Sequence, residues 1–169
     1  MSKELNYQIK YGNKIIDKNS FLTPTEAINK PTINYNANIN TLYTIIMYDP
    51  DSINGTFIHW IIINIPVNNI NKGFELLPYK GPSPPNKTGI HRYIFDLFEQ
   101  KNKIKSYQIE NRNISLENIK KKLEIQTEPI ASIQFTSEYK GGRNKKNTRK
   151  RNKNSRKRNK NTRKNNKII

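Results

Sequence analysis

The chain has 169 residues, no cysteine and a formal net charge of +18 at pH 7. Its length suits one domain with a single hydrophobic core. The lack of cysteine excludes disulfide bonds, thiol nucleophiles and cysteine-ligated zinc. No apolar run reaches the ~20 residues that cross a bilayer, and the first ten residues lack the apolar segment of a signal peptide.

The charge divides the chain into two parts. From Lys140 onward there are 15 Lys/Arg and no acidic residue, whereas residues 1–139 hold the other 16 Lys/Arg and all 13 Asp/Glu. Gly141-Gly142 marks a hinge between them. The basic part repeats every seven residues without any apolar position, which excludes a coiled coil. We therefore predict a domain at 1–139 and a disordered Lys/Arg/Asn-rich tail at 140–169.

The first local signal in chain order is "TPTE" at 23–26. It has the residues of a capping box, with proline at the first helical position. A second proline, Pro31, follows soon afterwards, so a helix here receives little weight.

Short apolar runs then indicate strands, because each is rich in β-branched or aromatic residues and is bounded by Pro, Gly, Asn or Asp. They cover residues 42–48, 58–65, 92–100 and 130–135. The run Ile61–Ile65 is continuously apolar, which suggests burial on both faces. The sequence therefore predicts a mostly β domain with one or two short helices.

The clearer helix is expected at 115–123, "SLENIKKKL". Ser115 can cap its start, Glu117 lies in the first turn, and Lys120–Lys122 lie in the last turn, where cations suit the helix dipole. An apolar stripe at i, i+3 and i+7 completes the pattern: Leu116, Ile119 and Leu123.

Two aspartates and a histidine lie close together in "YDPDSINGTFIHW", residues 48–60. Such residues form many metal and hydrolytic sites, but no second close histidine or HExxH spacing supports zinc. There is also no GxSxG nucleophile elbow. We therefore expect no metal site, no cofactor and no catalytic residue. Asp51 is expected to cap an Asx-type turn that Pro50 fixes.

The two histidines of the chain, His59 and His91, lie beside apolar strands. His91 follows "YKGPSPPNKTGI" (79–90), a loop whose prolines restrict its backbone conformation. Loops of this type commonly line binding sites. The residues alone leave two interpretations open, because a lone histidine beside an apolar strand is more often a satisfied core residue. Core positions are expected for Trp60 and Phe95, and a structural salt bridge to Asp96 or Glu99 is expected for Arg92.

Several spaced motifs resemble the signature of the phosphatidylethanolamine-binding protein family, which is also called the Raf kinase inhibitor protein family. They are "DPD" (49–51), "HWIIINIP" (59–66) and "YKGPSPPNKTGIHRYIFDLFEQ" (79–100). The upstream segments "LTPTEAINKPT" (22–32) and "LYTIIMYDPD" (42–51) are similar to it as well. The resemblance runs from about Phe21 to Glu138, and the basic tail has no counterpart in the family pattern.

The resemblance implies a Greek-key β-sandwich with a pocket at one edge that holds an anion, such as phosphate, acetate or the phosphoryl head of phosphatidylethanolamine. By position, the pocket residues are Asp49, His59, Gly81, Ser83, Pro84, His91 and Tyr93. Some family members inhibit kinases or proteases, but no residue of this chain argues for that activity.

The chemistry of these residue types agrees with an anion pocket. A phosphoryl group needs hydrogen-bond donors, and imidazoles, a phenol and loop amides can supply them. Asp49 would orient an imidazole, keep it protonated, or accept from a ligand ammonium. The sequence departs from the family at "DPDSI", where "DPDAP" is usual, and at Ser83, where many members have glycine or cysteine.

These observations predict a non-enzymatic binding module for phosphate or a phosphoethanolamine-type ligand. The alternative is a nucleic-acid-binding or packaging protein that acts through its tail, because such a density of cations attracts polyphosphates. Residues 140–167 also suit an anionic membrane surface. The abundance of Asn, Lys and Ile follows A/T-rich codons. The lack of cysteine and of a signal-peptide segment predicts a cytoplasmic protein, not a secreted one, or a virion protein if the source is a large DNA virus.

Overall fold

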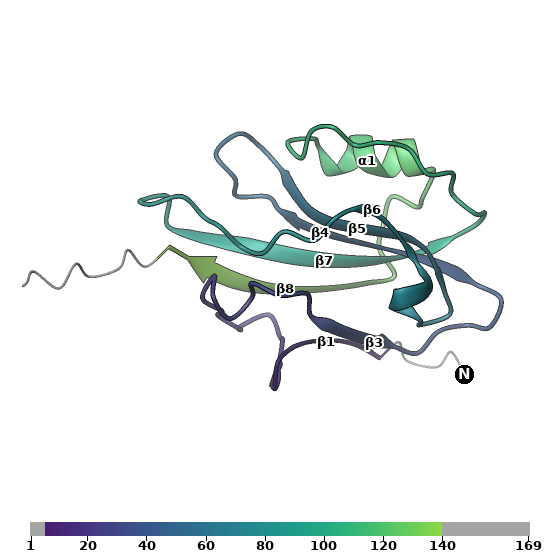
Figure 1. Cartoon of the computed structure of the whole chain (residues 1–169), viewed down its shortest axis with the longest axis horizontal. Helices are drawn as coiled ribbons and strands as arrows, with labels where there is room; N and C mark the ends of the chain where they lie inside the picture. Colours follow the sequence, from purple (N-terminus) through teal and green to yellow (C-terminus); the bar gives the residue numbers. More distant parts are fainter. Residues whose placement is uncertain (1–5, 140–169) are drawn as a thin grey trace, which may run out of the picture.

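The computed structural model describes residues 6–139 and places two antiparallel sheets face to face (Figure 1). The large sheet has the strand order β6-β5-β4-β7-β8, and the small sheet has the order β2-β1-β3. The strands of the large sheet are β4 (Leu42–Asp49), β5 (Phe57–Pro66), β6 (Phe74–Leu77), β7 (Ile90–Gln100) and β8 (Ala131–Glu138). Those of the small sheet are β1 (Tyr7–Tyr11), β2 (Lys14–Ile15) and β3 (Thr32–Tyr35).

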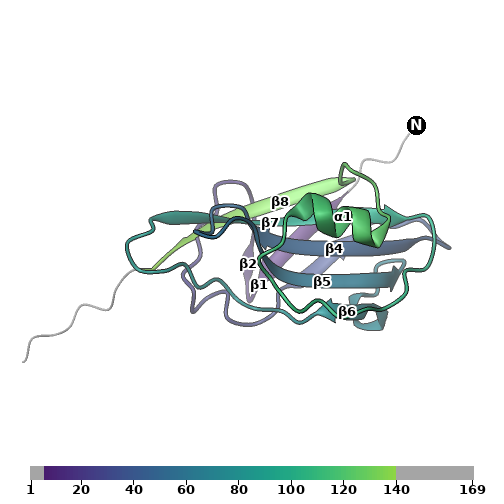
Figure 2. The ribbon, with the colours of Figure 1, turned by 90° about the horizontal axis from the view of Figure 1, so that it is seen from above.

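Helix α1 (Leu116–Leu123) lies across the face of the large sheet that points away from the small sheet (Figures 1 and 2). A short 3-10 helix, Ile70–Lys72, follows β5. The domain thus has three layers, in which the large sheet is buried on both faces. This explains why β5 is apolar at consecutive positions.

The large sheet contains a Greek key. Strands β4, β5 and β6 follow one another, and β7 then returns to lie beside β4, so that the spatial order is β7-β4-β5-β6. This is the 4-1-2-3 order that defines the motif. The predicted Greek-key β-sandwich is confirmed.

Two hydrophobic cores lie on the two faces of the large sheet. The core between the sheets includes Tyr43, Trp60, Tyr93, Phe95 and Phe135. The core under α1 includes Ile46, Ile61, Phe98, Ile119 and Leu123. The predicted core positions of Trp60 and Phe95 are confirmed, with 2% and 0% of their surfaces exposed.

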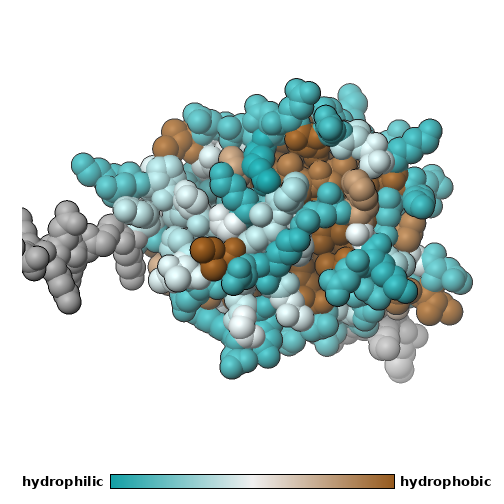
Figure 3. Space-filling view, in the orientation of Figure 1, coloured by the Kyte–Doolittle hydropathy of each residue, from teal (hydrophilic) through white to brown (hydrophobic). Residues whose placement is uncertain are grey.

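The face seen in Figure 1 is mostly hydrophilic. Apolar atoms gather mainly in a patch to the right of centre, in the region of β6, and smaller apolar spots lie elsewhere on this face (Figure 3). Strand β6 is an edge strand of the large sheet, so this patch lies where the sandwich is open. The molecule therefore has a well-covered centre and an incompletely covered edge.

The predicted strands at 42–48, 58–65, 92–100 and 130–135 correspond to β4, β5, β7 and β8. The helix predicted at 115–123 is confirmed, since Ser115 caps α1 by accepting from the Asn118 backbone N–H. The expected Thr23–Glu26 capping box also forms, with Thr23 N–H donating to Glu26 Oε2 at 2.7 Å, but it closes a turn and not a helix.

Strands β1, β2, β3 and β6 were not predicted. They have at most five residues each, and polar residues interrupt them, as in β3, "TINY". Strand β1 pairs with β2 and β3, and β6 pairs with β5. Their strand conformation depends on this pairing, and a local sequence pattern does not reveal the partner strand. The tail predicted at 140–169 lies outside the described residues.

Candidate functional site

A cavity of about 220 Å³ opens at one end of the large sheet. Strand β4 ends there at Asp49, and β5 and β7 begin there at Phe57 and Ile90. Of the seven residues predicted from the sequence, Asp49, His59, Ser83 and His91 line the cavity wall. The fold thus brings together residues that are up to 42 positions apart in the chain.

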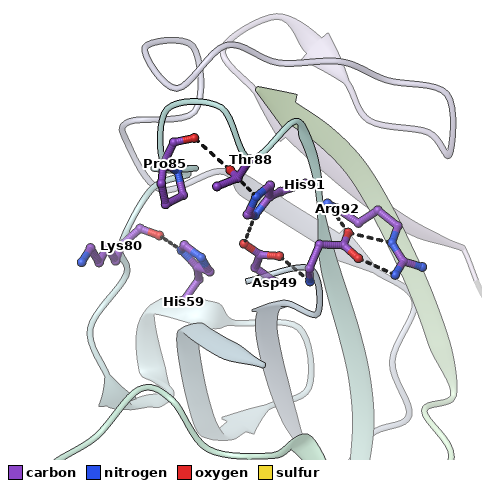
Figure 4. A network of polar contacts seen from close by, with 8 residues as sticks. Asp49, His59, Lys80, Pro85, Thr88, His91 and Arg92 are labelled. Atoms are coloured by element: carbon purple, nitrogen blue, oxygen red, sulfur yellow. Dashed lines mark hydrogen bonds and ion pairs between the residues drawn. The ribbon is translucent and has the colours of Figure 1, made fainter. Parts of the chain in front are cut away.

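His91 is held between two partners inside this wall (Figure 4). Its Nδ1 lies 2.7 Å from Asp49 Oδ2, and its Nε2 lies 2.8 Å from the Thr88 hydroxyl. The Thr88 hydroxyl itself donates to the Pro85 carbonyl at 2.8 Å. Both the histidine and the aspartate are buried, with 1% and 3% of their surfaces exposed.

This chain of contacts determines where the protons lie. A hydroxyl has one hydrogen atom, and Thr88 uses it toward the Pro85 carbonyl, so its oxygen accepts from His91 Nε2. Ionised Asp49 accepts from Nδ1 on the other side. Both ring nitrogens of His91 are thus engaged by groups of the protein itself. The geometry therefore suits the role of orienting carboxylate for Asp49.

The second carboxylate oxygen of Asp49 also forms part of this arrangement. This oxygen, Oδ1, accepts from the Asp51 backbone N–H at 2.8 Å, which closes an Asx turn over Pro50. The sequence predicted an Asx turn capped by Asp51, and this was wrong in its residue, because the carboxylate that closes the turn belongs to Asp49. Both Asp49 oxygens are thereby occupied.

The carboxylate of Asp51 instead binds Arg92. Arg92 Nη2 donates to Asp51 Oδ1 at 2.7 Å, and Nε donates to Asp51 Oδ2 at 2.9 Å. The hydrogen bonds from Arg92 lower the pKa of Asp51 despite the opposing effect of burial. Asp96 and Glu99 were the wrong partners. Asp96 lies four residues along β7, about 13 Å away, and Glu99 accepts from Tyr43 and Asn38.

His59 faces the same cavity because β5 contains a β-bulge. Met47 of β4 pairs with Trp60 and the next residue, Tyr48, pairs with Ile58, so His59 is the extra residue. Regular alternation would point His59 and Trp60 to opposite faces of the sheet. The bulge re-aims His59 into the cavity while Trp60 stays in the core between the sheets, as bulges beside functional sites commonly do.

The imidazole of His59 is fixed in one tautomer. Its Nδ1 lies 2.6 Å from the Lys80 carbonyl oxygen, which can only accept, so Nδ1 carries the hydrogen atom (Figure 4). Burial is the main cause that lowers the pKa of His59 to about 4, and the nearby cations Arg112 and Lys80 lower it further against the Lys80 carbonyl. His59 is thus neutral near pH 7 and has a lone pair on Nε2.

Gly81, Pro84 and Tyr93 do not line the cavity. A Cβ atom at Gly81 would lie 2.7 Å from the Ala27 carbonyl oxygen, so this glycine allows the loop to pack against another backbone segment. Pro84 is buried beneath the loop. Their positions indicate that they shape the loop and do not touch the cavity contents.

Tyr93 lies behind the two histidines, in the core between the sheets. Its ring stacks on Phe135 with 5.2 Å between centroids and meets His59 edge-on at 5.1 Å. Burial raises the pKa of Tyr93, and the Asp49 carboxylate raises it further, although the Ser83 backbone N–H opposes them. No described residue gives its buried hydroxyl a hydrogen bond of ordinary geometry. The ring supports the floor of the site.

Several residues around the cavity were missed by the sequence analysis. Phe57, Asn54, Asn113 and Lys80 line it, with the Lys80 ammonium 5.1 Å from the centre of the Phe57 ring. These residues lie on three separate segments and share no motif. Only Lys80 could have been predicted from the sequence, because it directly precedes "GPSPP".

Arg112 is a further residue that the sequence did not indicate. Its Nη1 donates to the carbonyl oxygens of Ile58 and His59 at 3.1 and 3.0 Å, and its Nη2 donates to that of Pro78 at 2.8 Å. It therefore ties the β5 bulge to the loop that carries Lys80. Burial lowers the pKa of Arg112.

Within residues 6–139, no group of three or more His, Asp and Glu side chains is placed so that it could hold a metal ion. In the same part of the chain, no helix has the length and apolar character needed to cross a membrane. The chemistry of the cavity is thus that of its hydrogen-bonding groups and nearby cations.

Comparison with known proteins identifies relatives across the described domain. Residues 5–135 match the model of the family described as "Phosphatidylethanolamine-binding protein". The chain is 37% identical over 112 residues to the "26 kDa secreted antigen" of Toxocara canis, covering 63% of this chain and 40% of the relative. It is 39% identical over 98 residues to the rice (Oryza sativa subsp. japonica) "Protein MOTHER of FT and TFL1 homolog 2", covering 54% and 55%. The chain spans about half the length of the curated relatives that it matches.

A solved structure shows the same fold. The phosphatidylethanolamine-binding protein from Plasmodium vivax superposes with a TM-score of 0.67 at 22% identity, covering 79% of this chain and 84% of that chain. The family match covers most of the chain and includes the strand ends that form the cavity. The chain therefore belongs to the phosphatidylethanolamine-binding protein family.

Proposed function

We propose that the chain is a non-catalytic binding protein whose cavity takes a small phosphoryl anion, either phosphate or a phosphoethanolamine-type head group. The observation that carries this proposal is the convergence of His59, His91 and Asp49 on one small opening, with Lys80 at its rim. A phosphorylated head group is of suitable size for a cavity of about 220 Å³.

The charges around the cavity support an anionic ligand. The two oxygens of Asp49 already accept from His91 Nδ1 and from the Asp51 N–H, so they do not face an incoming anion unpaired. Lys80 and Arg112 are close enough to disfavour a positive charge on His59. An anion that enters the cavity meets positive potential, and this potential is stronger in a partly desolvated site.

The hydrogen-bond inventory corrects one detail of the sequence-based interpretation. Both histidines were expected to donate to the anion, but the N–H of neutral His59 is used on Lys80, and both N–H groups of His91 are used on Asp49 and Thr88. His59 Nε2 can bind a phosphoryl oxygen in two ways. It accepts from a P–OH group, or it takes up a proton and donates to the ionised oxygen.

Binding is therefore expected to take up a proton. A bound anion stabilises the imidazolium form of His59 and raises its pKa from the value of about 4 in the free protein. The affinity for phosphate should accordingly rise as the pH falls from about 7.5 to about 6. Because phosphate itself titrates in this range, the comparison is with His59→Asn, which should lose the part of the dependence that His59 causes.

The test is an NMR titration of the histidine ring signals with inorganic phosphate, phosphoethanolamine and ethanolamine, each at constant pH. Saturable shifts of His59 and His91 at millimolar phosphate or phosphoethanolamine are expected, and ethanolamine alone should cause none. Absence of shifts with both phosphorylated ligands at millimolar concentration would refute the proposal. A response to ethanolamine alone would show that the cavity recognises the ammonium and not the anion.

Two lysines of the same loop provide a matched comparison. Lys80 lines the cavity, whereas Lys87 is exposed on the loop and does not. The substitution Lys80→Gln should weaken phosphate binding several-fold, and Lys87→Gln should leave it unchanged although it removes the same charge. Equal weakening by both variants would indicate nonspecific attraction by the basic chain.

We also propose that the protein is located in the cytoplasm or in a virion, as expected from the sequence. The Toxocara canis relative is named as a secreted antigen. Fractionation of the source cells, with the protein detected in the soluble, membrane and external fractions, decides between these locations.

A further inference from the structure

A second cationic surface lies at the opposite end of β7 from the cavity. It surrounds the segment Lys103–Lys105 and has two hollows, one on each side of this segment. The first hollow, of about 500 Å³, extends to the end of α1 at Lys122, and the second, of about 640 Å³, extends to Lys72 and Phe74. We call the two together the lysine hollows.

The backbone between the lysine hollows is held rigidly from below. Ile104 N–H donates to Asn64 Oδ1 at 2.8 Å, and Asn64 Nδ2 donates to the Ile104 carbonyl oxygen at 2.8 Å. Gln100 Nε2 also donates to Asn64 Oδ1, at 2.9 Å. The Ile104 side chain packs against the core under α1. Lys103 and Lys105 therefore project from a fixed point.

Asn64 occupies this position because of a second bulge in β5. Its φ is +56°, and the pairing of β4 with β5 shifts register between Tyr43 and Ile45 at this point. Asparagine tolerates this left-handed conformation better than most residues. The bulge directs the asparagine amide toward Ile104 and away from the regular ladder, so the sheet itself positions the lysine segment.

The lysines of these hollows form no salt bridge within the described domain. They are exposed, and none forms an ion pair with a described residue: Lys72, Lys101, Lys103, Lys105 and Lys122. Glu124 is the one acidic residue among the described residues that line the hollows. Lys122 lies in the last turn of α1 and Lys72 in the last turn of the 3-10 helix, whereas Lys101, Lys103 and Lys105 lie outside any helix. Clustered like charges destabilise a fold, which indicates a binding role.

We propose that the lysine hollows bind the phosphodiester backbone of a single-stranded nucleic acid. The lysines at 103 and 105 are two residues apart, and their neighbours at 72 and 122 continue the positive charge on both sides. A strand that crosses the fixed segment meets cations along its path. Phe74, with 49% of its surface exposed at the wall of the second hollow, provides a ring on which a base can stack.

The shape of the surface selects this partner over two others. A flat bilayer reaches protruding side chains but does not enter hollows. A duplex keeps its bases paired and stacked, so the exposed ring of Phe74 would have no base face to stack on. A single strand fits both the concavity and the exposed ring. This site does not depend on the anion cavity, since β7 spans 11 residues between them, or roughly 33 Å.

The test is a residue-resolved NMR titration of the full chain with a short oligothymidylate. Because each amide is observed separately, binding by the basic tail does not mask binding at the hollows. Saturable shifts are expected for the amides of Phe74, Lys103, Ile104 and Lys105. The proposal is overturned if shifts occur only beyond Gly142, if phosphatidylserine vesicles cause the same shifts, or if inorganic phosphate does so.

A matched pair of variants completes the test. Lys103→Gln/Lys105→Gln removes two charges at the hollows, and Lys18→Gln/Lys87→Gln removes two exposed charges elsewhere. Affinity measured from the amide shifts at the lysine hollows falls as salt rises. In the first variant the magnitude of the slope of log affinity against log salt should decrease by about 1.4, since each phosphate contact to a single strand contributes about 0.7. The second should leave the slope unchanged, and an equal loss in both variants would contradict a specific site.

Discussion

His59 is the residue at which local structure and chemistry meet most directly. The β-bulge brings its ring to the cavity, the Lys80 carbonyl fixes its tautomer, and burial keeps it neutral. No described residue hydrogen-bonds its Nε2. The site therefore has one acceptor whose protonation controls how it meets an anion, while His91 is held by Asp49 and Thr88.

The burial of His59 predicts a dependence of stability on pH. Its pKa is about 4 in the folded chain, below the unfolded value of 6.5, so the unfolded state takes up the proton first. The contribution is fully present above about pH 6.5 and is lost as the pH falls toward about 4, with about 2 kcal/mol lost by about pH 5. Urea unfolding at pH 7.5 and at pH 5 measures it.

The control for this prediction is His59→Asn. An asparagine can still donate to the Lys80 carbonyl but does not titrate. The difference between the unfolding free energies at the two pH values should be smaller in this variant by about 2 kcal/mol. Identical pH dependence in both proteins would show that His59 is not protonated on unfolding in this range. Arg112, Lys80, His91 and Asp49 are the other charged groups around the ring.

The two aspartates of "DPD" are predicted to differ in their effect on stability. Asp49 is buried and both its oxygens accept hydrogen bonds, so Asp49→Asn places an amide N–H₂ against a donor and leaves His91 without a counter-charge. A loss of about 3 kcal/mol is expected. Asp51 pairs with Arg92 where both side chains are partly exposed, so Asp51→Asn should cost less than about 1 kcal/mol.

Urea unfolding of the two variants at pH 7 compares these costs directly, because each replaces one carboxylate with its amide. A cost for Asp51→Asn equal to or above that for Asp49→Asn would contradict the assignment of the buried pair as the structural centre of the site.

Among the elements, β5 has the most influence on function. It carries one bulge at His59, which turns this side chain into the cavity, and another at Asn64, which anchors Ile104. Its two ends thus serve two separate surfaces. The sequence indicated a continuously apolar strand at 58–65, and this was confirmed, but bulges depend on the register with β4, which no local pattern contains.

The loop between β6 and β7 is positioned by backbone packing as well as by proline. At Gly81 a Cβ would be 2.7 Å from the Ala27 carbonyl oxygen and 3.2 Å from Ile28 Cα. Gly81→Ala is therefore expected to push the loop outward and to cost about 1 to 3 kcal/mol in unfolding free energy. It should also weaken phosphate binding, because Lys80 precedes this glycine.

The control on the same loop is Ser83→Ala, which adds no atom and lies on the exposed side. Its unfolding free energy should stay within about 0.5 kcal/mol of the parent chain. If Gly81→Ala unfolds at the same urea concentration as Ser83→Ala, the close approach to residues 27–28 does not constrain the loop.

At the scale of the whole molecule, the domain has two cationic surfaces at opposite ends of β7. The cavity proposed to bind an anion lies at the Ile90 end, and the lysine hollows lie near Gln100. Strand β8 ends at Glu138, which pairs with Ile90, so the described domain ends near the cavity. Residues 1–139 hold 16 Lys/Arg and 13 Asp/Glu. The positive charge at the two ends of β7 therefore comes from where the fold places the lysines and arginines, and less from the net charge of the domain.

The separation predicts that the two surfaces act independently. Lys103→Gln/Lys105→Gln should leave the phosphate-induced shifts of His59 unchanged, and His59→Asn should leave the oligothymidylate-induced shifts of Lys103 and Lys105 unchanged. Sites this far apart without shared partners have additive effects. The two NMR titrations above, performed on both variants, measure this, and reciprocal loss of binding would show that the surfaces are coupled.

Much of this protein follows from the sequence alone. The length and spacing of the apolar runs determine that the domain is mostly β, and the motifs around Asp49, His59 and His91 identify its family and the end of the sheet at which the cavity forms. Side-chain chemistry and capping preferences also determine α1, because its signals lie within nine residues of each other.

Only the tertiary structure decided which groups contact one another. The hydrogen bonds that occupy both histidines, the pairing of Arg92 with Asp51, the support of His59 by Arg112 and the lysine hollows all join distant segments. Strand register and the two bulges of β5 set these contacts, and register depends on the balance of packing over the whole sheet. A local sequence pattern fixes the residue types at a site, but it does not fix their hydrogen-bond partners.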